Sequence, residues 1–191
     1  MKPSPWWAYQ RSRLFALFRC HDRAIAELQE ALRVDPSYMQ AASSLGFLYG
    51  NQGRHQLAAE LFQRALRLKP DNAVLLFNLG YVLHLQKHFE AAIEAFEGAV
   101  RLSPKIDRAW YGMGLALAAL GRHADAAQAL ERASELQPMN GHAWYELGMA
   151  YFTLGRRDKL AEVIAHLDRF DPKMAQHLTR ATQQPVAAKA S

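Results

Sequence analysis

Apolar positions recur along the chain with helical spacing, in pairs of segments that return every 34 residues. In the stretch 73–104, AVLLFNLGYVLHL is followed by a short polar turn and then by FEAAIEAFEGAV. Five prolines mark the period, at Pro36, Pro70, Pro104, Pro138 and Pro172. A fixed period in this range predicts a solenoid, because one unit cannot bury its own apolar face and must stack on its neighbours.

Each period predicts two helices, the second of which ends just before the proline. We predict units at approximately residues 5–38, 39–72, 73–106, 107–140 and 141–174, all within one domain over residues 1–182. A tight corner is expected at His21-Asp22-Arg23, between the first two helices. An amphipathic helix over 173–182 is expected to cap the array with its polar side outward. The small residues of 183–191 predict a disordered tail.

The residues inside each unit resemble the tetratricopeptide repeat, a 34-residue helix–turn–helix unit. The unit from Ala73 carries that family's signature at Leu79, Gly80, Leu83, Ala92, Phe96, Ala99 and Pro104. The resemblance covers about residues 5–174. It implies an all-α fold, a right-handed superhelical solenoid of five helix–turn–helix units plus a C-terminal capping helix.

Two units depart from this pattern. The first has Arg11 and Ser12 where Leu-Gly is expected, and the fifth has Leu160, Ile164 and Leu167 in its second helix. In all the units that keep it, the glycine of the signature is expected where the two helices pack closest, since a side chain would push them apart. These glycines are Gly46, Gly80, Gly114 and Gly148.

Charge and cysteine content narrow the function classes. The net charge of +5 is spread along the chain without a run of Lys or Arg, whereas a nucleic-acid binder would cluster its cations. The basic balance favours acidic partners only weakly. The single cysteine, Cys20, allows no disulfide within the chain and fits a reducing compartment. No apolar stretch approaches the length of a membrane span, and no convincing secretory signal is found, so we expect a cytoplasmic protein without stable membrane insertion.

The sequence contains no arrangement typical of catalysis. There is no nucleophile–base pair, Gly-rich phosphate loop or pair of acids in a pocket-like context. His84 and His88 are four residues apart, but Gln86-Lys87 predicts a turn between them, and no Cys or carboxylate completes a tetrahedral zinc site. We therefore expect no enzyme, no cofactor and no metal.

In the tetratricopeptide family the first helices line a concave groove in which ligands usually lie. The resemblance implies that the following residues form it: Tyr9, Arg13, Phe47, Asn51, Phe77, Asn78, Tyr81, His84, Arg108, Tyr111, Tyr145, Glu146 and Met149. Aromatic residues recur at one repeat position in four units and suit a peptide with apolar anchors. The alternative is that these rings only pack along the array.

Some members of the family clamp a C-terminal carboxylate with Lys, Asn and Arg at fixed groove positions. Asn78 and Arg108 match that pattern, but Ser43, Phe47 and Gly112 stand where Lys, Asn and Arg belong. A clamp needs several convergent donors. An internal or helical segment is therefore the expected ligand.

These observations predict a non-enzymatic scaffold or chaperone-like adaptor that binds a peptide segment of a partner protein. An alternative is a structural protein that self-assembles into a homo-oligomer through its N-terminal helix, whose apolar surface would otherwise be uncovered. A metal-dependent enzyme that uses the histidines ranks behind both.

Overall fold

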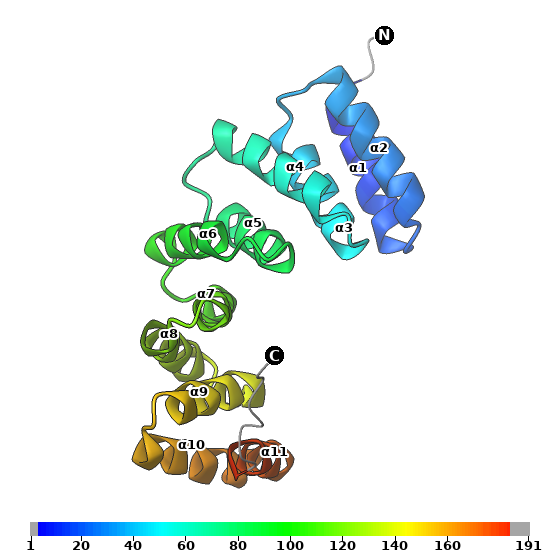
Figure 1. The fold of residues 1–191 in the computed structure, drawn as a ribbon. Helices are drawn as coiled ribbons and strands as arrows, with labels where there is room; N and C mark the ends of the chain where they lie inside the picture. The colour runs from blue at the N-terminus through cyan, green and yellow to red at the C-terminus, as the bar shows by residue number, and fades with distance from the viewer. Residues whose placement is uncertain (1–3, 184–191) are drawn as a thin grey trace, which may run out of the picture. The chain divides into compact units, whose positions relative to one another are not determined.

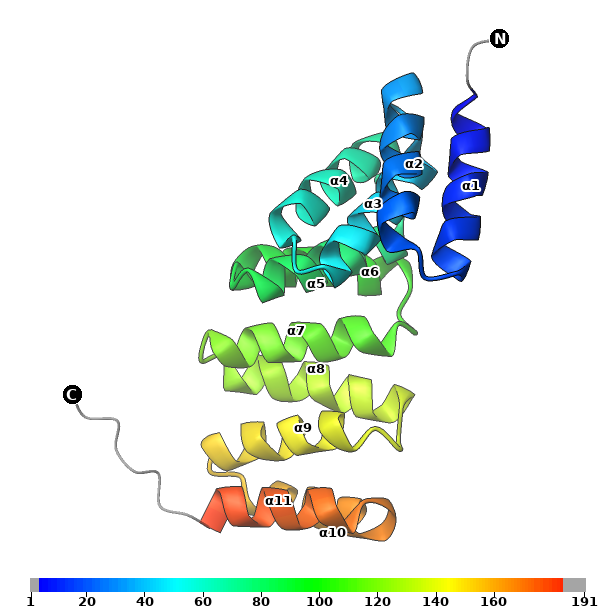
Figure 2. The same ribbon diagram turned by 90° about the vertical axis from the view of Figure 1, so that its right-hand side faces the viewer.

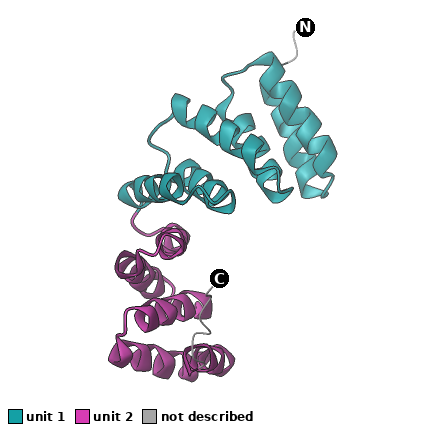
Figure 3. Cartoon of the chain, in the orientation of Figure 1, with its two compact units in different colours: residues 1–103 teal, residues 104–191 magenta. Residues whose placement is uncertain are grey.

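The computed structural model describes residues 4–183, and this part of the chain forms eleven α-helices and no strand (Figure 1). The prediction of an all-α helical solenoid is confirmed. The chain divides into two compact units, residues 1–103 and 104–191 (Figure 3). The tail predicted at the C-terminal end lies outside the described residues from position 184 onward.

Unit 1 contains three helical hairpins that stack in chain order, since α2 packs on α3 and α4 packs on α5. Each hairpin pairs two antiparallel helices of 13 and 14 residues. The six helices are α1 (Pro5–Leu17), α2 (His21–Val34), α3 (Met39–Asn51), α4 (His55–Leu68), α5 (Ala73–Leu85) and α6 (Phe89–Leu102).

Unit 2 contains two further hairpins and a last helix, and α8 packs on α9 (Figure 2). The last helix, α11, contacts both α9 and α10. It begins one residue earlier and ends one residue later than expected. The five helices are α7 (Asp107–Ala119), α8 (His123–Leu136), α9 (Gly141–Thr153), α10 (Arg157–Phe170) and α11 (Pro172–Gln183).

The prolines end the second helix of every repeat, as predicted. Helices α2, α4, α6, α8 and α10 each stop two residues before a proline of the 34-residue series. Pro172 differs from the others because it is itself the first residue of α11, where its missing N–H needs no partner. Asp171 precedes it, and its Oδ1 accepts a hydrogen bond from the Met174 N–H at 3.1 Å.

The turn inside each hairpin uses one residue in the left-handed region. Gly53, Gly121 and Gly155 have φ of 76°, 75° and 69°, and Arg19 and Lys87 occupy the same repeat position with φ of 57° and 63°. The predicted corner at His21-Asp22-Arg23 is wrong, because α2 already begins at His21. The chain turns before it, and the Cys20 N–H donates to the Phe15 carbonyl at 2.8 Å.

The signature glycines do permit close helix contacts. A Cβ on Gly80 would lie 2.8 Å from the Phe96 ring, and one on Gly46 would lie 2.9 Å from the Phe62 ring. Phe62 and Phe96 are almost fully buried. Gly114 meets Leu130 in the same way. These pairs join the two helices of one repeat, as predicted.

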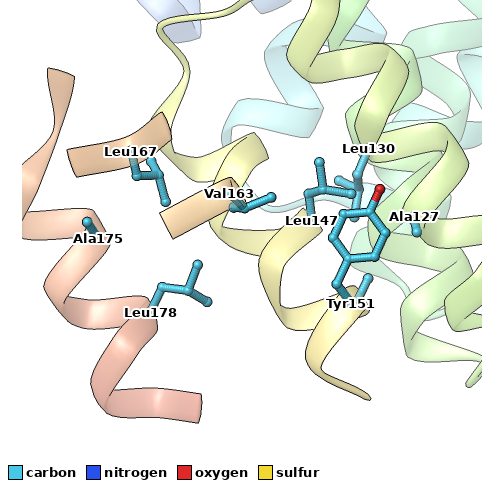
Figure 4. Close-up of a cluster of buried hydrophobic side chains, with 9 residues drawn as sticks. Ala127, Leu130, Leu147, Tyr151, Val163, Leu167, Ala175 and Leu178 are labelled. Atoms are coloured by element: carbon cyan, nitrogen blue, oxygen red, sulfur yellow. The ribbon is translucent and has the colours of Figure 1, made fainter. Parts of the chain in front are cut away.

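The fifth repeat breaks this rule, and the prediction for Gly148 is wrong. A Cβ on Gly148 would collide with Leu178 of α11, not with a residue of α10. The other second helices have a fully buried Ala at the position of Leu160. In α10 this position is the half-buried Leu160. The close contact to Gly148 is supplied by Leu178 of α11, which lies in one buried cluster with Val163 and Leu167 of α10 (Figure 4).

The first repeat forms a normal hairpin despite its unusual residues. Ser12 stands at the glycine position, is 2% exposed, and donates its hydroxyl to the Tyr9 carbonyl at 2.7 Å. Arg11 stands where the later repeats bury a leucine or methionine, and its guanidinium forms a two-point ion pair with Glu27 at 2.9 and 2.7 Å. In the first repeat, Arg11 with its ion pair to Glu27 therefore replaces the leucine of the signature, and Ser12 replaces the glycine.

Polar contacts between neighbouring elements also recur with the repeat. Gln29 of α2 donates to the Tyr49 hydroxyl of α3 at 2.9 Å, and three periods later the Tyr151 hydroxyl of α9 donates to Glu131 of α8. Trp144 donates its indole N–H to the Pro138 carbonyl at 2.8 Å, which ties the linker to the helix that follows. These bonds fix the register in which one hairpin stacks on the next.

Candidate functional site

All thirteen residues that the sequence predicts as ligand contacts lie on the first helix of a repeat. They come from α1, α3 and α5 in unit 1, and from α7 and α9 in unit 2. We call this set the first-helix face. None of the thirteen is fully buried, and five of them are exposed: Arg13, Phe47, Asn51, Tyr81 and Arg108. Their side chains are therefore at least partly accessible, although their contact with a ligand stays a prediction.

Two exposed aromatic rings mark this face in unit 1. Phe47 of α3 is 55% exposed and Tyr81 of α5 is 51% exposed. They stand at the same repeat position, 34 residues apart, on helices that contact each other. Burying exposed aromatic area is a main source of binding energy at interfaces, so both side chains are suited to anchor an apolar ligand group.

Phe77 is placed differently from Phe47 and Tyr81. Its ring stacks on Tyr81 at a centroid distance of 6.4 Å and lies 6.1 Å from the buried ring of Phe96. The side chain is half-buried. Phe77 therefore links the core of the hairpin to the exposed ring of Tyr81 and supports its orientation.

The remaining unit 1 residues surround these rings. Tyr9 is half-buried and meets Tyr38 edge-on at 5.6 Å, and Arg13 donates to Gln10 at 3.4 Å. Asn51 is the exposed last residue of α3, and Asn78 is half-buried on α5. Amide groups at such positions can bond the backbone of an extended ligand.

His84 closes this part of the face on α5. Its ring lies edge-on to Phe89 at 5.4 Å, and its Nδ1 is buried without a hydrogen-bond partner. Burial lowers the pKa of His84, so the imidazole is neutral near neutral pH. A neutral ring among aromatic residues favours an apolar role for His84 over a charged one.

In unit 2 a carboxyl group lies between aromatic rings. Burial raises the pKa of Glu146, and the charge of His142 partly offsets this. Burial also raises the pKa values of Tyr111 and Tyr145, and in both cases the Glu146 charge adds to the effect, so this carboxylate lies close to both rings. Tyr111, Tyr145 and Met149 pack against the buried cluster of unit 2.

Sequence reasoning missed His177 as part of this arrangement. His177 is a polar residue of α11, whose polar side is expected to face outward, yet its ring stacks on Tyr145 at 4.9 Å with an interplanar angle of 16°. The repeat pattern could not reveal this contact, because α11 follows the last period and has no equivalent in the earlier units. Arg108 is exposed on α7, at the first-helix face of the same unit.

Within residues 4–183 the geometry offers no metal site and no membrane span. No three side chains of His, Cys, Asp or Glu converge there in a way that could hold a metal ion. None of the helices in that range combines the length and the apolar composition that crossing a bilayer requires.

Helical hairpins that repeat every 34 residues and stack on their chain neighbours define a helical solenoid built for contact with other molecules. The family model of the tetratricopeptide repeat matches residues 19–73, 48–106, 86–137 and 111–174. The chain belongs to the tetratricopeptide repeat family, which confirms the resemblance found in the sequence. Proteins of this fold are generally non-enzymatic interaction scaffolds, and membership of the family supports a protein-interaction scaffold.

Solved structures of this fold cover nearly the whole chain. YrrB, described as a TPR protein with an unusual peptide-binding site, is 25% identical, with a TM-score of 0.81 over 91% of this chain and 90% of YrrB. A MamA protein is 22% identical, with a TM-score of 0.84 over 98% of this chain and 100% of the MamA chain. A structure of MamA from residue 41 to the end, from Desulfovibrio magneticus RS-1, is 22% identical, with a TM-score of 0.78 over 96% of this chain and 100% of that structure. The MamA structures show the fold alone. No curated protein sequence matches the chain significantly.

Proposed function

We propose that the protein is an adaptor that holds a peptide segment of a partner protein against its first-helix face. The proposal includes the thirteen residues of that face as contacts. It also keeps one solenoid domain over residues 1–182, and a cytoplasmic location that rests on the lone, exposed Cys20.

The exposed pair Phe47 and Tyr81 carries this proposal. The large apolar side chains of the repeat signature in the second and third hairpins are buried, whereas these two rings, which lie outside the signature, leave half of their surface accessible. Phe47 and Tyr81 do not contribute to the close glycine contacts, so packing alone does not require aromatic residues there. A peptide with apolar side chains in register with the two helices would bury both rings.

The likeness to YrrB supports a peptide as the ligand. YrrB has a peptide-binding site by its description, and its likeness to this chain extends over nine-tenths of both. The carboxyl group of Glu146, held among Tyr111 and Tyr145, adds a preference in unit 2. A half-buried carboxylate is stabilised by a cation, so a basic side chain of the ligand is the favoured neighbour of Glu146.

The test uses peptides selected from a random library against the full chain, because such a library samples many possible partner segments at once. Calorimetric titration of one selected peptide compares wild type with Phe47→Ala and Tyr81→Ala. Each substitution should weaken binding by about tenfold, the effect of losing an interface anchor. The matched control is Leu102→Ala, which removes a 44% exposed apolar side chain from α6. Equal affinity of all four proteins would refute the proposal.

A second candidate function is self-assembly through α1. Trp7, Leu14 and Phe18 are 60%, 54% and 68% exposed. One period later, Ala41 and Leu48 occupy the positions of Trp7 and Leu14 and are buried against the preceding hairpin. The same surface of α1 is therefore apolar but uncovered within the described residues, and a second copy could cover it.

Light scattering after size-exclusion chromatography tests this second function. Self-assembly predicts a mass above that of one chain for wild type, and a single-chain mass for Trp7→Ser combined with Leu14→Ser. Leu68→Ser combined with Leu102→Ser is the control, because both leucines are exposed on second helices. A wild-type protein that stays monomeric up to its solubility limit would exclude this function.

A further inference from the structure

A pocket of about 500 Å³ lies at the turns of the second and third hairpins of unit 1, and none of its lining residues belongs to the first-helix face. Its lining combines the turn after α3 with the start of α4, and the end of α5 with the residue before α6. The residues are Gly53, Arg54, His55, Gln56, Leu57, Gln86 and His88. Every charged or polar side chain in this set can donate a hydrogen bond, and none of them is a carboxylate.

Two helix N-termini open at this pocket and add further donors. The residues before α4 and α6 are Arg54 and His88, one period apart, and neither side chain caps the helix that it precedes. The first turn of α4 contains no acidic residue. Basic residues are the less favourable choice at a helix N-terminus, where the backbone N–H groups and the helix dipole favour negative charge. An anion in the pocket would compensate for that arrangement.

Two side chains of the lining leave a polar atom unsatisfied. The Nδ1 of His55 and the Nε2 of Gln86 are both buried without a hydrogen-bond partner. Such atoms are rare in folded proteins and often indicate a bound ion or water. The two atoms belong to residues of the pocket lining that come from two different hairpins of the unit.

The Arg54 guanidinium packs on an aromatic ring and forms no ion pair in the described part of the chain. Its Cζ lies 4.0 Å from the centroid of the Tyr49 ring, and no ion pair within residues 4–183 includes it. Two acids lie nearby: Glu60 accepts a hydrogen bond from Gln56 at 3.1 Å, and Glu90 is exposed in the first turn of α6. At the equivalent position in unit 2, Arg122 is paired with Asp125 at 2.7 Å.

We propose that this pocket binds a carboxylate from an acidic segment of a partner protein. Phosphate shares the same oxyanion chemistry, but two observations favour a protein segment. The donors are spread over five side chains on two turns, which suits an extended chain better than one compact ion. Lys87, exposed between Gln86 and His88 without an ion pair in the described part of the chain, can meet a second carboxylate of the same segment.

The test is an NMR titration of the full isotope-labelled chain at constant ionic strength, with hexaglutamate, hexaglutamine and inorganic phosphate as separate probes. Hexaglutamate should cause saturable shifts of the His55, Gln56 and Phe89 amides and of the Gln86 side-chain amide. Hexaglutamine should cause none. Phosphate should shift the same signals with lower affinity, because it engages fewer cations.

Arg54→Gln is the decisive variant, and Arg122→Gln is its matched control, since both remove one positive charge at the same repeat position. Arg54→Gln should weaken hexaglutamate binding by about tenfold, as expected for a charged hydrogen-bonding group. Arg122→Gln should leave it unchanged. The proposal is overturned if both variants weaken binding equally, if phosphate binds more tightly than hexaglutamate, or if no probe shifts these signals. None of these outcomes depends on peptide binding at the first-helix face.

Discussion

The residue that closes each hairpin must adopt a left-handed backbone, whichever side chain it carries. Three repeats have glycine there, at Gly53, Gly121 and Gly155, and two have Arg19 and Lys87 with φ near 60°. An L-residue in this region pays roughly 1–2 kcal/mol that glycine does not. Nothing lies within 4 Å of a Cβ placed on Gly53 or Gly121, so the requirement is purely conformational.

Because the requirement is conformational, we predict different losses of stability for two alanine substitutions at this repeat position. Gly121→Ala should lower the free energy of unfolding by about 1 kcal/mol, because alanine must adopt the strained φ. Lys87→Ala should change it by less than about 0.5 kcal/mol, because the wild-type residue is already strained and exposed. Urea unfolding followed by circular dichroism measures both. A large loss for Lys87→Ala would show that its side chain, and not the backbone, matters there.

Glu146 provides a second test at the level of one residue. Burial raises its pKa, so the folded state holds the proton more tightly than the unfolded state, whose carboxyl has a pKa of about 4.3. The stabilising contribution is full below that unfolded value and is lost as the pH rises through the folded pKa. At neutral pH the ionised, half-buried carboxylate therefore lowers stability.

Glu146→Gln should accordingly raise the free energy of unfolding at about pH 7, and this gain should shrink as the pH falls towards about 4. The measurement is urea unfolding of wild type and variant at several pH values. Glu97→Gln is the control, because Glu97 is exposed on α6. If Glu146→Gln is less stable than wild type at neutral pH, the carboxylate already has stabilising contacts within the protein. That result would contradict the proposal that Glu146 pairs with a basic side chain of the ligand.

Helix α11 does more than cover the end of the solenoid, because it also supplies a core contact of the fifth repeat. It covers Gly148 with Leu178, which is fully buried, and so takes the place that α10 would fill in a regular repeat. Leu178→Ala should therefore cost about 2–5 kcal/mol, the usual range for a buried leucine. Ile164→Ala, at the position that fills this contact in the regular repeats, should cost clearly less because Ile164 is only half-buried. Chemical denaturation of the two variants measures which substitution costs more stability. If the fifth repeat packed like the others, Ile164→Ala would cost more than Leu178→Ala.

The sequence predicts the elements well wherever the repeat continues. The proline series places the ends of five helices, and the signature glycines identify the contacts of Gly46, Gly80 and Gly114. It fails where the repeat stops, because the packing of α11 on α9 has no earlier copy to be read from. It also cannot separate exposed rings from supporting ones. Tyr81 and Phe77 follow the same helical spacing, and only the contact with Phe96 shows that Phe77 is held in the hairpin.

At the scale of the molecule, the hairpins of each compact unit stack in chain order. Residues one period apart therefore lie at equivalent positions on neighbouring hairpins. The first-helix face and the turn pocket of unit 1 are two products of that repetition. Aromatic side chains recur on the former, and hydrogen-bond donors recur at the latter. A repeat protein can thus build extended binding surfaces from residues that would be isolated in a globular fold.

The central claim, capture of a peptide segment on the first-helix face, is tested most directly by mapping a library-selected peptide on the full chain by NMR. The account predicts that the shifted signals come from first helices, either α3 and α5 of unit 1, led by Phe47 and Tyr81, or α7 and α9 of unit 2, around Tyr111 and Glu146. Signals confined to the second helices α4, α6, α8 and α10 would contradict it.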